Sequence, residues 1–178
     1  RADEDVSYAI ESTVDGAFFN SGQSCCGLER IYVHESVYDD FLEGFLALTN
    51  SYQLGRSDDP ETTLGPMVRA SAADFVRQQI TEAVTQGTVA HINPKHFSMD
   101  ETGSPYMAPQ VLTQVDHSMR VMTEESFGPV VGIMKVANDN EAINLMNDSD
   151  LGLTAAIYTQ DIDQGIELGD QIETGTFY

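Results

Sequence analysis

The sequence is short of basic residues. Its 178 residues include 8 lysines and arginines against 29 aspartates and glutamates, which gives a formal net charge of −21. At long range such a charge repels both a nucleic-acid backbone and an anionic membrane surface, so we expect neither as a partner. A solvated acidic surface is the simpler interpretation of the charge, and an acidic binding surface is the alternative.

Long apolar runs are also missing. No stretch approaches the roughly 18 to 20 consecutive apolar residues that a membrane-spanning helix needs, and the first residues lack the basic and apolar regions of a signal peptide. We therefore expect a soluble, cytoplasmic protein. The chain begins at Arg1 without a methionine and stops at Tyr178 within a strand-like run, so we expect a piece of a larger enzyme.

Cysteine is scarce, which limits disulfide bonding. The two cysteines, Cys25 and Cys26, are neighbours in the sequence. Their Cα atoms would lie about 3.8 Å apart across a trans peptide, closer than the roughly 4.4 to 6.8 Å of relaxed disulfides. We expect both thiols to be reduced, in agreement with a cytoplasmic setting.

Recognisable metal and phosphate sites are absent as well. His91 and His96 are not spaced for one helix face, and no cysteine or paired carboxylate completes a zinc set. His34 and His117 have no serine or cysteine partner at a catalytic spacing, and are expected to be solvated or structural. The sequence contains neither GxGxxG nor GxxxxGKS. We expect no metal, and a dinucleotide would have to lie mainly on sequence outside these residues.

Helix-like and strand-like periodicities alternate along the chain. They predict helices near residues 6–18, 36–48, 68–86, 139–147 and 162–170, and strands near 31–33, 88–92, 110–115, 130–136, 154–159 and from 175. Strands separated by helices imply an α/β fold with a largely parallel sheet in a three-layer domain. The length favours a single domain, residues 1–178.

Two of the predicted helices carry more specific expectations. Ser36 followed by Asp39 resembles a capping box at the start of the second helix. Gly87 supplies the stop of the third helix. The apolar residues that this third helix is expected to bury are Ala72, Phe75, Val76, Ile80, Ala83 and Val84.

Cys25 follows the end of the first predicted helix and the turn-forming Gly22. A bend there would expose the thiol at the rim of the sheet, beside free N–H groups that could hold the oxyanion formed when a carbonyl is attacked. A thiol is a strong nucleophile only as the thiolate. By itself this pattern is a weak indication, since a buried and inert cysteine is the commoner case.

The residues around Cys25 are more informative. The run FFNSGQSCCGLER (residues 18–30) resembles the active-site cysteine signature of the aldehyde dehydrogenase superfamily, whose GQxC pattern selects Cys25 as the nucleophile. The run EESFGPV (residues 124–130) resembles a second element of the same family. Weaker similarities at LGP (64–66), MAP (107–109), GLT (152–154) and ETG (173–175) extend the resemblance nearly from end to end.

The resemblance implies roles for individual residues. In relatives the second glutamate of the EESFGPV-like element hydrogen-bonds the nicotinamide ribose, and the aromatic residue two positions later packs near the cofactor. Here these residues are Glu125 and Phe127. A charged carboxylate strengthens each hydroxyl hydrogen bond that it accepts. Ser24 and Cys26 flank the nucleophile and could line an aldehyde tunnel, although a packing role for Cys26 is equally open.

The resemblance also implies a fold and an activity. The fold would be that of an aldehyde dehydrogenase catalytic domain. The activity would be oxidation of a small-molecule aldehyde to a carboxylic acid through a cysteine thiohemiacetal and a thioester, with NAD or NADP as cofactor. The full-length parent would be a homo-oligomer.

Several parts of the family's machinery are missing from these residues. Relatives take their general base from an ELGGK-type element shortly before the cysteine signature. That element, the upstream asparagine of the oxyanion site and the Rossmann-like cofactor domain are absent. We therefore expect the 178 residues alone to be inactive.

Three alternatives stay open. An acylating relative would pass the thioester to coenzyme A, and an interaction domain would keep the fold without the chemistry. A cysteine hydrolase is the third, disfavoured because no histidine is placed by a motif. Neither the aldehyde nor the choice between NAD and NADP can be read, because the residues that decide them are absent or variable.

Overall fold

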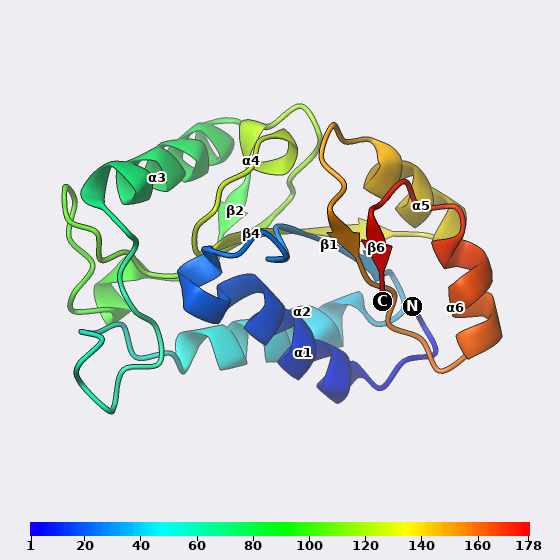
Figure 1. Cartoon of the computed structure of the whole chain (residues 1–178), viewed down its shortest axis with the longest axis horizontal. Helices are drawn as coiled ribbons and strands as arrows, with labels where there is room; N and C mark the ends of the chain where they lie inside the picture. Colours follow the sequence, from blue (N-terminus) through cyan, green and yellow to red (C-terminus); the bar gives the residue numbers. More distant parts are fainter.

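The computed structural model describes residues 1–178, the whole chain. Its main sheet has four strands in the order β1–β4–β3–β2 (Figure 1). These strands are β1 (Arg30–His34), β2 (Val89–Ala90), β3 (Gln110–Thr113) and β4 (Val130–Val136). β1, β4 and β3 are parallel, and β2 is antiparallel to β3. The predicted α/β fold with a largely parallel sheet is confirmed.

A second, smaller sheet stands beside the first. It consists of β5 (Thr154–Ala155) and β6 (Thr176–Phe177), which are parallel. The predicted strand 154–159 is longer than the hydrogen-bonded one, since β6 is the only strand paired with it. Figure 1 shows both chain termini close to this pair.

Helices cover both sides of the sheets (Figure 1). They are α1 (Val6–Phe18), α2 (Tyr38–Asn50), α3 (Ala70–Thr85), α4 (Arg120–Thr123), α5 (Asp139–Asn147) and α6 (Ile162–Gly169), with 3₁₀ turns at Phe19–Gly22 and Pro94–His96. α1 and α2 run along one side of the main sheet, and α3, α4 and α5 lie on the other. No helix of the structure is both long and apolar enough to cross a bilayer.

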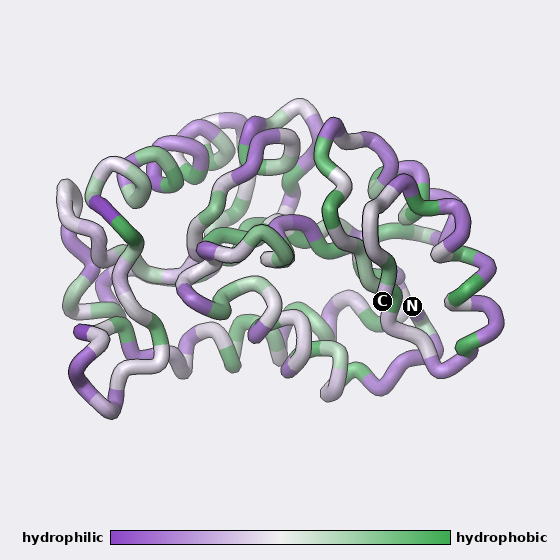
Figure 2. Tube along the Cα trace, in the orientation of Figure 1, coloured by the Kyte–Doolittle hydropathy of each residue, from purple (hydrophilic) through white to green (hydrophobic).

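Alternation along the central strands builds two cores. Val111 and Val131 pack with α1 and α2, whereas Leu112 and Val130 pack with α3 and α4. Successive side chains of a strand point to opposite faces, so a strand covered on both faces is apolar at nearly every position. Figure 2 shows hydrophobic colour along these central strands and hydrophilic colour on the outer faces of the helices.

The start of α2 differs from the prediction. The structure places Val37 in the N-cap position, where it offers no side-chain oxygen to the helix. The Ser36 hydroxyl lies 2.8 Å from His34 Nδ1. The predicted capping box is wrong, because Ser36 is used in the preceding turn and the helix begins two residues later.

The buried face of α3 is also rotated from the predicted one. Phe75 and Val84 are 37% and 44% exposed, although both were expected inside, whereas Gln79 is buried. The Arg120 guanidinium covers the exposed Phe75 ring, 5.6 Å from its centroid. Apolar residues occur on more than one face of this helix, so periodicity alone did not select the stripe that meets the sheet.

Candidate active site

The predicted nucleophile follows a tight turn at the end of α1. Asn20, Ser21 and Gly22 have φ values of 50°, 58° and 70°, three left-handed residues in a row. Glycine adopts this conformation freely and asparagine tolerates it, whereas serine is strained there. The Ser21 hydroxyl donates a 2.6 Å hydrogen bond to the Gly65 carbonyl, which holds the strained residue in place.

Gln23 fixes the same turn from its other side. Its side-chain oxygen accepts a hydrogen bond from the Val68 N–H at 2.7 Å, and its amide donates to the carbonyls of Pro66 at 3.3 Å and Asn20 at 3.0 Å. The glutamine of the GQxC pattern therefore has a structural role, because it links the cysteine loop to the loop that contains LGP (64–66).

Cys25 lies on the surface at the end of this turn. Both cysteines are free and exposed, with their sulfur atoms 3.9 Å apart. The hydrogen bond with Cys25 raises the pKa of Cys26, so Cys26 keeps its proton to a higher pH than an ordinary thiol. The Cys25 backbone N–H donates no hydrogen bond within the chain. It is free to hold a developing oxyanion.

The cysteine loop packs directly against the second sequence motif. A side chain at Gly22 would collide with the carbonyl oxygen of Gly128. Gly128 in turn faces Val76 and Met67, whose side chains would lie 2.6 Å and 3.0 Å from an added Cβ. Glycine at both positions thus allows the two motifs, far apart in the sequence, to meet.

Glu29 is a second connection between the motifs, which the sequence analysis missed. Its carboxylate accepts hydrogen bonds from the backbone N–H groups of Ser126 at 2.8 Å and Phe127 at 2.9 Å. Burial is the largest influence on its pKa and raises it, the charge of Glu125 acts in the same direction, and the two N–H donors oppose them. These partners lie 97 and 98 positions along the chain, so spacing alone could not indicate them.

A cleft of about 360 Å³ contains part of the predicted site. Its lining includes Cys25, Ser24 and Glu125, but neither Cys26 nor Phe127. Phe127 is 41% exposed and has a positive φ of 49°. The structure therefore brings three of the five predicted residues to one cleft.

The two adjacent glutamates of EESFGPV differ in their surroundings. Glu124 is held by Arg120 through hydrogen bonds of 3.0 Å and 2.9 Å, which lower its pKa. Glu125 is exposed and makes no hydrogen bond or ion pair within the chain. Of the two, Glu125 is thus the carboxylate available to a bound ligand.

No histidine belongs to the cleft lining. His117 lies 2.9 Å from the Tyr32 hydroxyl and 2.8 Å from the Asp148 carboxylate, and so links β1 to the end of α5. His91 is bonded to Thr113 at 2.7 Å. A cysteine hydrolase would need such a base beside Cys25, so this geometry does not favour that alternative.

Comparisons of this chain with a family model and with curated proteins agree on one family. The family model described as "Aldehyde dehydrogenase family" matches residues 1–178. The chain is 31% identical over 176 residues to benzaldehyde dehydrogenase YfmT of Bacillus subtilis (strain 168), covering 99% of this chain and 35% of that protein. The chain thus spans about a third of the length of the curated relatives that it matches.

Solved structures agree with this result. NADP-dependent glyceraldehyde-3-phosphate dehydrogenase from Bacillus halodurans C-125, complexed with NADP, superposes with a TM-score of 0.90 at 33% identity, over 99% of this chain and 36% of that one. Betaine aldehyde dehydrogenase from Staphylococcus aureus, in complex with NAD+, gives a TM-score of 0.89 at 28% identity, over 98% of this chain and 35% of that one.

Proposed function

Because this chain belongs to the aldehyde dehydrogenase family, we propose that it carries the nucleophile of an aldehyde-oxidising site, with Cys25 attacking the carbonyl carbon. One observation supports this most directly: the exposed Cys25 thiol shares a cleft with the unpaired carboxylate of Glu125. Beside that sulfur is a backbone N–H without a partner.

The chain's own groups account for the first step. The Cys25 thiolate adds to the aldehyde carbon and forms a thiohemiacetal, whose oxyanion accepts a hydrogen bond from the Cys25 N–H. A bound NAD or NADP, held by Glu125, would supply the acceptor for the hydride that leaves this carbon. The product on the cysteine is a thioester, and water then releases the carboxylic acid and restores the thiol.

Glu125 fits the position of a cofactor ligand. An unpaired, exposed carboxylate in the cleft can accept two ribose hydroxyl hydrogen bonds, and no residue of the chain competes for it. The neighbours solved with NADP and with NAD+ support either cofactor. Phe127 lies outside the cleft lining, so its cofactor contact is carried only by its place in the motif.

We further propose that the 178 residues are not active by themselves. The hydrolytic step needs a general base. In the cleft, Glu29 is engaged by two backbone N–H groups and Glu124 by Arg120, and Glu125 is the carboxylate that we assign to the cofactor ribose. The chain also covers only about a third of its relatives. Steady NADH production by the purified chain would contradict this part of the proposal.

Competition between an aldehyde and an alkylating reagent tests the nucleophile. Iodoacetamide labelling, located by peptide mass spectrometry, is compared in the unaltered chain, Cys25→Ser and the matched control Cys26→Ser. We expect benzaldehyde to slow alkylation of Cys25, in Cys26→Ser as well as in the unaltered chain, because the thiohemiacetal blocks the sulfur. Equal labelling of both cysteines, unchanged by the aldehyde, would sink the proposal.

A further inference from the structure

The two cysteines occupy the middle of a tight turn. The Gly27 N–H donates a 3.0 Å hydrogen bond to the Ser24 carbonyl, and the Cys26 N–H donates a 3.3 Å hydrogen bond to the Ser24 hydroxyl. These four residues therefore form a β-turn with Cys25 and Cys26 at its two central positions. Just after the turn, the Leu28 N–H donates to a carbonyl of α1 at 3.0 Å. The backbone that carries both sulfur atoms is thus held in one shape.

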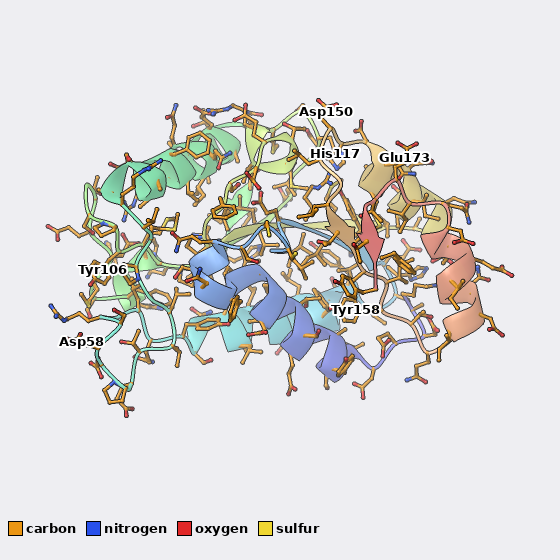
Figure 3. All side chains as sticks on the ribbon, viewed as in Figure 1. Asp58, Tyr106, His117, Asp150, Tyr158 and Glu173 are labelled. Atoms are coloured by element: carbon orange, nitrogen blue, oxygen red, sulfur yellow. The ribbon has the colours of Figure 1, made fainter.

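The two sulfur atoms are close together but lie in different surroundings. They are 3.9 Å apart, and both side chains are exposed. Cys25 belongs to the lining of the cleft, whereas Cys26 does not. The cleft extends as far as the small sheet, and Figure 3 shows two residues of its lining, Tyr158 and Glu173, beside β6. An acyl group on Cys25 would therefore start in the cleft, and the same group on Cys26 would start outside it.

The arrangement lets one sulfur atom reach a group bound to the other. Reacting atoms in a near-attack arrangement lie about 3–3.5 Å apart, and an acyl carbon is bonded directly to the Cys25 sulfur. The Cys26 side chain is exposed, so rotation about its Cα–Cβ bond can bring its sulfur to that carbon. No movement of the turn is needed. A thiol held in this way reacts as if it were highly concentrated.

The proton on Cys26 depends on the state of Cys25. The hydrogen bond with Cys25 is the main reason why the pKa of Cys26 is raised, and the charge of Cys25 acts in the same direction. A Cys25 that carries an acyl group has neither the charge nor the thiolate acceptor. Both causes are then removed, so Cys26 ionises more readily. Since the thiolate is the reactive form, Cys26 becomes a nucleophile when Cys25 is acylated.

We propose that the acyl group formed on Cys25 moves to Cys26, a step that rests on the proposed function above. The Cys26 thiol gives its proton to water, and its thiolate attacks the thioester carbon. The bond from this carbon to the Cys26 sulfur forms, the bond to the Cys25 sulfur breaks, and Cys25 leaves as a thiolate, with no change in oxidation state. The unpartnered Cys25 N–H holds the oxyanion of the intermediate. The transfer frees Cys25 for another aldehyde and needs no carboxylate to activate water.

Acetylation with p-nitrophenyl acetate tests the transfer without aldehyde or cofactor. The unaltered chain and the control Cys26→Ala receive a short pulse of the ester, which is then removed. Free thiols are blocked with N-ethylmaleimide at successive times, the samples are acidified, and peptide fragmentation between residues 25 and 26 locates the acetyl group. Cys25→Ser, treated alike, gives the amount of Cys26 that the ester acetylates directly.

We expect the acetyl group to leave Cys25 of the unaltered chain at least about tenfold faster than it leaves Cys25 of Cys26→Ala, while Cys26 gains what Cys25 loses. The rate should not depend on protein concentration, because the step is internal. In urea the turn is lost, so we expect the transfer to be at least about fivefold slower.

The possible failures are distinct. Equal loss of acetyl from Cys25 in the unaltered chain and in Cys26→Ala would overturn the transfer and leave Cys25 as the nucleophile of the proposed function. Absence of acetyl from Cys25 in every chain would overturn both proposals. Equal transfer in the folded and the urea-unfolded chain would show that adjacency in the sequence suffices, and would overturn the role given to the turn.

Discussion

Removal of the Glu29 carboxylate should loosen the connection between the two motifs. In Glu29→Ala the N–H groups of Ser126 and Phe127 lose the acceptor that now lies 2.8 Å and 2.9 Å away. A buried donor left without a partner costs about 1–3 kcal/mol. The Ser126 N–H is partly buried, whereas water can reach the Phe127 N–H, so we expect a loss of about 1–3 kcal/mol in unfolding free energy.

Glu29→Gln separates the two hydrogen bonds from the side-chain volume. Glutamine keeps one acceptor oxygen and turns its NH₂ toward the other donor. Removing a mostly buried charge offsets part of this loss, because burial disfavours the ionised form of Glu29. The expected cost is therefore smaller, about 1–2 kcal/mol.

Urea unfolding of the three chains measures these differences. Glu43→Gln is the matched control: Glu43 is exposed on α2, so its replacement should change stability by less than about 0.5 kcal/mol. If Glu29→Ala is no less stable than this control, the carboxylate does not hold the two loops together, and our reading of this contact is wrong.

Three other changes test the structure. Gly22→Ala should lower the unfolding free energy by about 3 kcal/mol or more, because φ at Gly22 is +70° and a carbonyl oxygen blocks the added Cβ. Gly103→Ala, at a φ of +79° with open space around the Cβ, should lower it by only about 1–2 kcal/mol. Equal losses in urea unfolding would exclude the clash. Gln79→Met should raise the urea midpoint by the equivalent of about 1–3 kcal/mol, since both polar atoms of the Gln79 side chain are buried without hydrogen-bond partners. A lower midpoint would mean that these atoms have a hydrogen-bond partner. Burial raises the pKa of Tyr32 to about 12, above the ordinary value of about 10. The neutral Tyr32 side chain therefore makes its full contribution to the unfolding free energy below pH 10, and this contribution is lost as the pH rises toward 12. Tyr32→Phe should flatten that loss and remove one late-titrating phenol from the absorbance at 295 nm, and an unchanged titration curve would contradict this.

The sequence predicted the helices and strands correctly where an element buries one face only, or where it is covered on both faces. The helix predicted near residues 6–18 is α1, which buries a stripe through Ala9, Thr13 and Ala17, and the apolar run of β4 is a central strand. The prediction failed on α3, where packing and not hydrophobicity decides whether Phe75 or Gln79 is covered. It also missed α4, whose four residues are too few to show a period.

The site could be predicted only in part. Motifs led to Cys25 and Glu125, which the structure places in one cleft; their chemical roles stay predictions. Glu29 stood inside the quoted motif, but nothing local marks it, since its function in the fold depends on backbone groups of a distant loop. Contacts of this kind depend on how distant parts of the chain fold together, so the spacing of residues in the sequence does not reveal them.

The contact between Gly22 and Gly128 also has a consequence for biosynthesis. The thiol loop leaves the ribosome first, and its facing loop follows about a hundred residues later, after roughly five to twenty seconds at about 5–20 residues per second. During that interval the nascent chain presents a cysteine pair with no cleft around it. The cysteine loop can therefore reach its folded geometry only after the facing loop has been made, and slower translation between the two loops lengthens that delay.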